Sequence, residues 1–162
     1  MVIAIVSDTH LPRGARRLPD RLLSEARRAD LIVHAGDFVA LSVLRELESL
    51  GEVIAVHGNV DEQAVRARLP ETVSFEAEGA RLGVIHDAGT APGRLARMRA
   101  RFPQHDAVVF GHSHMPLRER ADDAFQIFNP GSPTERRRAP RRTMGIARVN
   151  AGKVCFELVT LG

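Results

Sequence analysis

The sequence predicts an α/β protein in which two β-sheets lie face to face and helices cover their outer faces. Two observations predict this class. Short apolar runs alternate with segments of helical periodicity in the first half of the chain, whereas only strand patterns follow residue 115. Alternating strands and helices form parallel sheets, and consecutive strands form antiparallel ones. We therefore expect one parallel sheet and a second, more antiparallel sheet.

The first half contains repeated strand and helix units. Residues 2–6 form a continuous apolar run, which is typical of a strand buried on both faces. Residues 19–29 carry apolar side chains at helical spacing, with charged side chains between them. The alternation continues with a strand at 30–34, a helix at 41–50 that ends at Gly51, a strand at 53–56 and a short helix that begins at Asp61.

The hydrophobic period changes after Pro70. Residues 72–77 and 81–86 flank the turn Glu78-Gly79-Ala80, which predicts a hairpin. The remaining expected elements are a last helix at 92–101 and strands at 106–110, 117–120, 125–128, 145–149 and 153–158. Residues 132–142 hold two prolines and five arginines, so we expect them to form an exposed loop.

Length and composition indicate a single globular domain spanning residues 1–162. A chain of this length buries about 70% of its unfolded surface, and 44% hydrophobic residues exclude a disordered class. The one cysteine, Cys155, cannot form an internal disulfide, and its strand-like setting predicts a packed thiol in a reducing compartment. No apolar run approaches the roughly 20 residues of a membrane span, so we expect a cytoplasmic protein with no membrane partner.

Polar side chains that bind metal ions follow the predicted strands. The turns that carry them are Ser7-Asp8-Thr9-His10, Ala35-Gly36-Asp37, His57-Gly58-Asn59-Val60-Asp61, His86 and Gly111-His112-Ser113-His114. Open α/β sheets keep their chemistry at the carboxyl ends of their strands. Within two of these turns the ligand residues are spaced i and i+2, so their side chains leave extended backbone on the same side.

Seven ligands are too many for one ion and suit two. The set is Asp8, His10, Asp37, Asn59, His86, His112 and His114. Without thiolates, the two divalent ions are expected to be Mn, with Fe, Zn, Ni and Mg as alternatives. A shared aspartate holds two cations about 3.5–4 Å apart, and a hydroxide between them is a nucleophile at neutral pH. Phosphoester hydrolysis is the reaction that such a pair serves best.

These blocks, in this order and at these separations, resemble the calcineurin-like metallophosphoesterase superfamily. The short length and Asn129-Pro130-Gly131-Ser132 resemble its small bacterial and archaeal phosphodiesterase branch, and the resemblance spans residues 1 to about 133. It implies a four-layer αββα sandwich of two mixed sheets flanked by helices. It also implies one metal ion at Asp8, His10, Asp37 and His114 and a second at Asp37, Asn59, His86 and His112. Among these we expect Asp37, Asn59 and His112 to act in catalysis.

Two positions depart from the pattern of the family. Many members have Gly-Asn-His followed by Asp or Glu, and that His acts on the phosphate or the leaving group; here Val60 occupies the position. Turnover is then slow or confined to good leaving groups, unless another residue or water protonates the departing oxygen. Asp87 follows His86 where relatives commonly have Gly and then His, and either orients a ligand or serves a turn or helix start.

Other basic residues have weaker assignments. We expect His34 to be buried as a hydrogen-bonding partner of the ligands, His57 to face the substrate or cap a strand, and His105 to lie in a surface loop. Arg13, Arg16 and Arg17 follow the Asp8 turn and are either solvated or reach a substrate phosphate. The arginines within 136–142 either contact RNA or a nucleotide or form an exposed charged loop.

The leading hypothesis is a metal-dependent phosphoesterase that acts on small phosphate esters, with diesters preferred. One alternative is a metal-binding scaffold, because the retromer subunit of vacuolar sorting resembles this fold and works mainly through protein contacts. Another is a nuclease acting on RNA or single-stranded DNA, which the arginine-rich loop would serve. A metallo-β-lactamase-like hydrolase is excluded because its His-x-His-x-Asp-His block is missing. The sequence does not define an oligomeric state.

Overall fold

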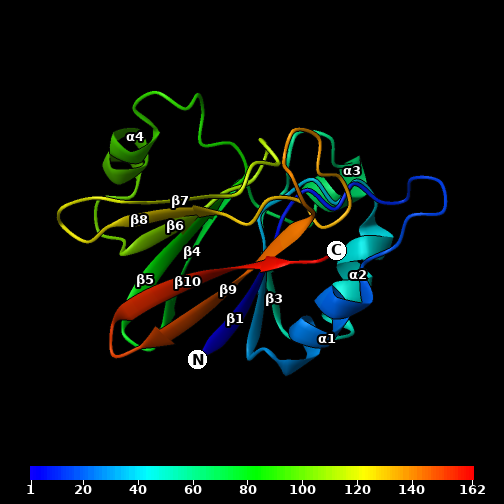
Figure 1. The fold of residues 1–162 in the computed structure, drawn as a ribbon, viewed down its shortest axis with the longest axis horizontal. Coiled ribbons are helices and arrows are strands. Elements are labelled where there is room, and N and C mark those ends of the chain that lie inside the picture. The colour runs from blue at the N-terminus through cyan, green and yellow to red at the C-terminus, as the bar shows by residue number, and fades with distance from the viewer.

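Two five-stranded sheets form the centre of the protein, and a computed structural model describes all residues from 1 to 162. The helices are α1 (Asp20–Arg28), α2 (Leu41–Glu48), α3 (Gln63–Arg66) and α4 (Arg94–Arg101). The strands are β1 (Val2–Val6), β2 (Leu31–His34), β3 (Val53–Ala55), β4 (Thr72–Ala77), β5 (Ala80–Ile85), β6 (Ala107–Val109), β7 (Leu117–Arg120), β8 (Gln126–Asn129), β9 (Thr143–Asn150) and β10 (Lys153–Thr160). Figure 1 shows α1, α2 and α3 on one side of the sheets and α4 on the other.

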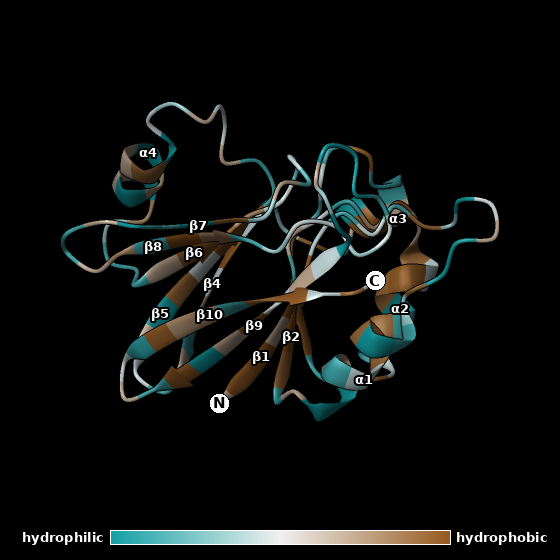
Figure 2. Ribbon diagram, viewed as in Figure 1, coloured by the Kyte–Doolittle hydropathy of each residue, from teal (hydrophilic) through white to brown (hydrophobic).

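The first sheet has the strand order β10-β9-β1-β2-β3 and is central to the layered packing. Successive side chains of β1 point to opposite faces, and both faces are buried. Ile3 and Ile5 pack between the two sheets, whereas Ala4 packs with Leu22 of α1 and Leu47 of α2. This two-sided burial explains the continuous apolar run of β1, which is hydrophobic along its length in Figure 2.

The second sheet has the order β4-β5-β6-β8-β7. Its inner face contributes Leu82, Val84 and Val109 to the cluster between the sheets. Its outer face packs on α4, where Met98 is buried with Val108. The result is the four-layer αββα sandwich of two mixed sheets that the resemblance implies. None of the four helices has the length and apolar character needed to cross a membrane.

The last two strands correct the predicted assignment of strands to sheets. We expected all strands after residue 115 to build the second sheet, but β9 and β10 extend the first one. β9 pairs antiparallel with β1, with Gly145 opposite Ile5. The second sheet also contains parallel pairs, β5 with β6 and β6 with β8, so both sheets are mixed.

Two burial predictions are wrong. Cys155 is exposed, because Val154 and Phe156 on either side of it face the core and alternation turns the thiol outward. The segment 132–135 is buried rather than part of an exposed loop. Its hydroxyl groups satisfy backbone carbonyls, since Ser132 Oγ donates to the carbonyl of Asp8 at 2.7 Å and Thr134 Oγ1 to that of Thr9 at 2.6 Å.

Candidate metal centre

The seven predicted ligands occupy loops that follow strands at one end of the two sheets. Asp8 and His10 follow β1, Asp37 follows β2, Asn59 follows β3, His86 follows β5, and His112 and His114 follow β6. Five of them have left-handed backbone: φ is 57° at Asp8, 45° at His10, 61° at Asp37, 67° at His112 and 58° at His114. Such backbone costs about 1–3 kcal/mol per residue and persists where the surrounding structure imposes it, commonly at functional sites.

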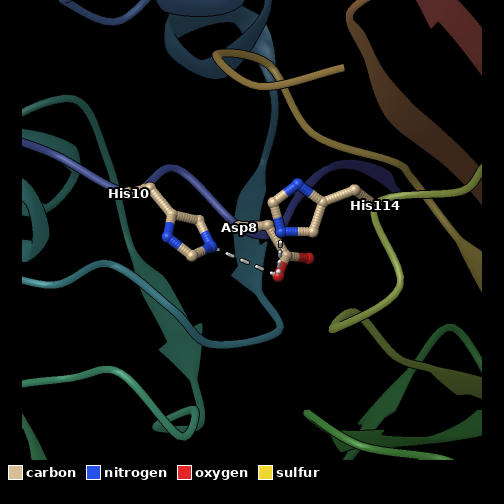
Figure 3. Close-up of side chains that lie close together, drawn as sticks. All are labelled: Asp8, His10 and His114. Carbon is tan, nitrogen blue, oxygen red and sulfur yellow. Dashed lines mark ion pairs between the residues drawn. The ribbon is translucent and has the colours of Figure 1, made fainter. Parts of the chain in front are cut away.

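Asp8, His10 and His114 form the first group (Figure 3). Asp8 Oδ1 lies 3.3 Å from Nε2 of His114 and 3.8 Å from Nε2 of His10. All three atoms are buried and have no hydrogen-bond partner. Such atoms are costly unless a ligand satisfies them.

Neighbouring groups orient the members of the first group. Ser7 Oγ donates to Asp8 Oδ2 at 2.6 Å, and the backbone N–H of His112 donates to the same oxygen at 3.1 Å, which leaves Oδ1 free. Nδ1–H of His114 donates to the carbonyl of Glu135 at 3.2 Å, so its Nε2 lone pair points toward Asp8. Burial opposes ionisation of Asp8, but the nearby histidines outweigh it and keep the pKa of this carboxyl below its usual range.

Asp37, Asn59, His86 and His112 form the second group. Asn59 Oδ1 lies 3.1 Å from Nε2 of His86 and 3.0 Å from Nδ1 of His112. Nδ1–H of His86 donates to the carbonyl of Ala35 at 2.7 Å, which leaves the Nε2 lone pair facing Asp37 Oδ2 at 3.3 Å. Electron-rich atoms at these distances require a proton or a cation between them.

Asp37 connects the two groups. Its Oδ2 is 3.5 Å from Nε2 of His10 and 3.3 Å from Nε2 of His86, and its Oδ1 accepts the backbone N–H of Val60 at 3.0 Å. Burial alone would raise the pKa of Asp37. The hydrogen bond and charge of His86 lower this pKa by a larger amount, so the net shift is downward. For His86, burial acts against the charged form and lowers the pKa. The carboxylate of Asp37 raises this pKa by a larger amount, so the net shift is upward. The structure therefore brings all seven predicted side chains into one cluster with Asp37 at its middle.

A model of the calcineurin-like phosphoesterase superfamily domain matches residues 1–152. The chain belongs to this superfamily. A probable metallophosphoesterase of Methanothermobacter thermautotrophicus is 33% identical over 100% of this chain and 94% of its own length. A phosphodiesterase of Methanocaldococcus jannaschii is 27% identical over 81% of this chain and 83% of its own length. The fold is shared with a single mutant of Vps29 from Entamoeba histolytica, with a TM-score of 0.79 at 20% identity and coverage of 100% of both chains.

Membership of the metallophosphoesterases implies divalent metal ions, and the donor atoms of this chain fit them. Two groups offer at least three ligand atoms within 4.8 Å of one another: Asp8 with His10 and His114, and Asp37 with His86 and His112. A positive charge would stabilise both groups, because the first has buried atoms without a hydrogen-bond partner and the second has lone pairs that face one another. Oxygen and imidazole donors suit borderline and hard ions, and they do not select one of these ions.

Asp61 holds the loops of the centre together, which the sequence analysis missed. It was expected to begin a helix, but α3 begins at Gln63 and Asp61 is buried. Its carboxylate accepts the backbone N–H groups of Gly58 at 2.6 Å, Val39 at 2.7 Å and Asp37 at 3.0 Å. The available signal in the sequence was a carboxylate two residues after Asn59. This signal is ambiguous, because a carboxylate accepts backbone N–H groups both at the start of a helix and where it holds loops together.

Asn129 supports another loop of the centre. Its Nδ2 donates to the carbonyl of Gly111 at 2.9 Å, and its Oδ1 accepts the backbone N–H of Gly131 at 2.8 Å. Together with the bond from Ser132 to Asp8, these contacts show that the block 129–132 supports the loops that carry the predicted ligands. The block positions ligands and does not contribute one to either group.

The remaining histidines and Asp87 lie as follows. His34 is buried, and its Nδ1 accepts the backbone N–H of Gly36 at 3.1 Å, so its Nε2–H donates to Thr9 Oγ1 at 3.2 Å. This matches the predicted hydrogen-bonding role.

His57 is half-buried beside Asn59 and lines a cavity of about 390 Å³. His105 bonds Ser74 at 2.7 Å, and Asp87 accepts the N–H of Gly89 at 2.7 Å, so Asp87 serves a turn.

Proposed function

We propose that this chain is a metal-dependent phosphoesterase that hydrolyses small phosphate esters, with phosphodiesters preferred. Two divalent ions, Mn by expectation, would occupy the two groups with Asp37 between them. When bound, such ions lower the pKa of water to give a hydroxide nucleophile and neutralise charge on the phosphate. The names of the relatives support phosphoester chemistry at the level of the superfamily.

The position of Asp37 is the observation that carries this proposal. One carboxylate oxygen lies 3.5 Å from His10 of the first group and 3.3 Å from His86 of the second. A negative charge shared by the two groups offsets repulsion between two cations. A structural metal site would instead surround one ion with four protein ligands and leave no coordination position open.

Exposure divides the seven side chains into two kinds. Asn59 and His112 are exposed, and the other five are buried: Asp8, His10, Asp37, His86 and His114. The buried residues can hold an ion but cannot reach a substrate. Asn59 and His112 face solvent at the same point, so we assign them contact with the substrate phosphate, where their donors would orient its oxygens.

The test is hydrolysis of bis-p-nitrophenyl phosphate by the full chain with added Mn²⁺. Activity should appear with the metal, disappear when a chelator is added and fall by at least about 100-fold in Asp37→Asn, because the bridging charge is lost. Asp122→Asn is the matched control, since Asp122 is exposed at the turn between β7 and β8 and should retain wild-type activity. Absence of ester hydrolysis with every divalent metal would contradict the proposal.

A scaffold function is the second candidate, and Val60 favours it. Val60 is 43% exposed at the position where many members of the superfamily carry the histidine that assists the leaving group. The fold is also that of Vps29. A chain that binds metal, hydrolyses no ester and keeps its affinity for a protein partner in Asp37→Asn would support this candidate over the enzyme.

A further inference from the structure

A cavity of about 980 Å³ has no hydrophobic residue in its lining, and one of its lining residues, Glu135, contacts His114 of the first group of the metal centre. Most of its lining is arginine: Arg13, Arg16, Arg136, Arg137, Arg141 and Arg142. Two loops far apart in sequence build it, one after β1 and one between β8 and β9. Both sets of arginines were expected from the sequence either to be solvated or to contact an anion.

Glu135 joins these arginines to the metal centre. Its side chain is buried and forms ion pairs with Arg13, with Arg16 at 2.7 Å and with Arg137 at 3.7 Å. Its backbone carbonyl accepts Nδ1–H of His114. Burial opposes ionisation of Glu135, but the contact with Arg16 outweighs it and keeps the pKa of this carboxyl below its usual value. One residue of the cavity wall therefore contacts a member of the first group directly.

The charge within the cavity is unbalanced. One carboxylate side chain faces six guanidinium groups. Three arginines contact Glu135, Arg142 donates to the carbonyl of Gly162, and Arg136 donates only to the carbonyl of Pro140 at 3.3 Å. Arg141 forms no hydrogen bond or ion pair. Clustered guanidinium groups repel one another unless an anion lies between them, and their planar donors match phosphate oxygens.

The lining also indicates which part of an anion would enter. The cavity is lined by no aromatic side chain on which a nucleobase could stack and by no hydrophobic residue. Single-stranded nucleic acid is bound by basic grooves that include such stacking platforms. Phosphate groups, rather than bases, therefore fit this cavity.

We propose that the arginine cavity is a second anion subsite, which binds a non-reacting phosphate or polyphosphate group of the substrate while the scissile phosphate lies at the metal centre. The inference rests on the proposed function and narrows its substrates to small esters that carry at least one further phosphate. The cavity would select such esters over bis-p-nitrophenyl phosphate, which has no second charged group.

The first experiment measures binding without catalysis. Metal-free protein, prepared over a chelating resin, is titrated with inorganic tripolyphosphate in a calorimeter. Charge-assisted hydrogen bonds to phosphate are about twice as strong as neutral ones, so Arg136→Gln/Arg141→Gln should weaken binding by at least about tenfold. The matched control Arg27→Gln/Arg28→Gln removes the same charge from exposed positions in the last turn of α1 and should bind as the wild type does.

The second experiment tests the subsite with a reacting ester. The p-nitrophenyl ester of thymidine 5′-phosphate is compared, with Mn²⁺, with the same ester carrying an additional 3′-phosphate. The ester with the additional phosphate should have a kcat/KM at least about tenfold higher, and this preference should disappear in Arg136→Gln/Arg141→Gln but not in Arg27→Gln/Arg28→Gln.

The outcomes separate this inference from the proposed function. Equal tripolyphosphate affinity in all three proteins, or equal kcat/KM for the two esters, would overturn the subsite while leaving the phosphoesterase intact. Tripolyphosphate binding with the expected pattern but no ester hydrolysis would support an anion site and overturn the enzyme. Tighter binding of a single-stranded RNA 10-mer than of tripolyphosphate would overturn the subsite in favour of a nucleic-acid groove.

Discussion

The backbone of Gly58 lies so close to Asp37 that a Cβ atom on Gly58 would stand 2.0 Å from Oδ1 of that aspartate. The same atom would be 2.5 Å from the backbone nitrogen of Asp37. No side chain fits there unless Asp37 moves. The absence of a side chain at position 58 thus leaves the space that is occupied by the carboxylate joining the two groups of the centre.

Gly58→Ala should therefore impair activity more than stability. Overpacking of this kind costs about 1–3 kcal/mol of the free energy of unfolding, whereas a displacement of Asp37 by about 1 Å costs about 100-fold in rate. Urea unfolding and kcat/KM for bis-p-nitrophenyl phosphate measure the two effects. Gly51→Ala is the control, because its nearest neighbour would be Ile32 Cδ1 at 3.9 Å. Wild-type kcat/KM in Gly58→Ala would contradict the role given to Asp37.

Val60→His should restore assistance to the leaving group. The side chain of Val60 is 43% exposed, so an imidazole fits without repacking the core, and the backbone N–H that bonds Asp37 is retained. General acid catalysis contributes about 10²–10⁴-fold, and its benefit grows as the leaving group becomes a stronger base. We expect the substitution to raise kcat for dimethyl phosphate, which releases methanol, far more than for bis-p-nitrophenyl phosphate, which releases p-nitrophenol.

Val60→Gln is the control for that experiment, because it adds a polar side chain that cannot transfer a proton at neutral pH. An equal gain in both variants would attribute the effect to polarity. No change in either variant would show that water already protonates the departing oxygen efficiently.

His34 should make the metal-free protein sensitive to mild acid. Burial lowers the pKa of His34 to about 3 from its ordinary value of 6.5. As the pH falls below 6.5, His34 is protonated in the unfolded chain but stays neutral in the folded chain. The free energy of unfolding therefore decreases. The slope of this effect reaches about 1.4 kcal/mol per pH unit and continues until the pH approaches the folded pKa.

Urea unfolding of the metal-free protein between pH 7.5 and 5 measures this slope. His34→Gln removes the titrating group and should flatten the profile over that window, even if it lowers stability at pH 7.5 by losing the hydrogen bond from Gly36. Parallel profiles for the two proteins would show that His34 does not resist protonation.

Local chemistry explains why the centre could be predicted from the sequence. Each ligand follows a buried apolar strand, and a parallel arrangement brings such strand ends together without knowledge of distant contacts. The partners of β9 and β10 could not be predicted in the same way, because alternation of side chains specifies a strand but not its neighbour. Burial of Glu135 was equally hidden, since it depends on arginines more than 100 residues away.

Asp8→Asn should affect the metal-free and metal-bound protein in opposite directions. Ser7 Oγ and the N–H of His112 both donate to Oδ2, so they fix the amide oxygen there and place the amide nitrogen where Oδ1 now lies. That nitrogen would donate to Nε2 of His114, which has no partner in the wild type. At pH 8.5, with no metal, the substitution should stabilise the protein by about 1 kcal/mol.

Addition of Mn²⁺ should reverse the order of stability. Binding to the folded state raises the wild-type Tm in proportion to RT ln(1 + [L]/Kd), whereas an amide nitrogen facing the ion removes this gain from Asp8→Asn. Thermal unfolding with and without Mn²⁺ measures both effects, and Asp122→Asn should follow the wild type in each. An equal Mn²⁺-induced rise in Tm for Asp8→Asn and the wild type would show that the first group does not bind the ion through Oδ1 of Asp8.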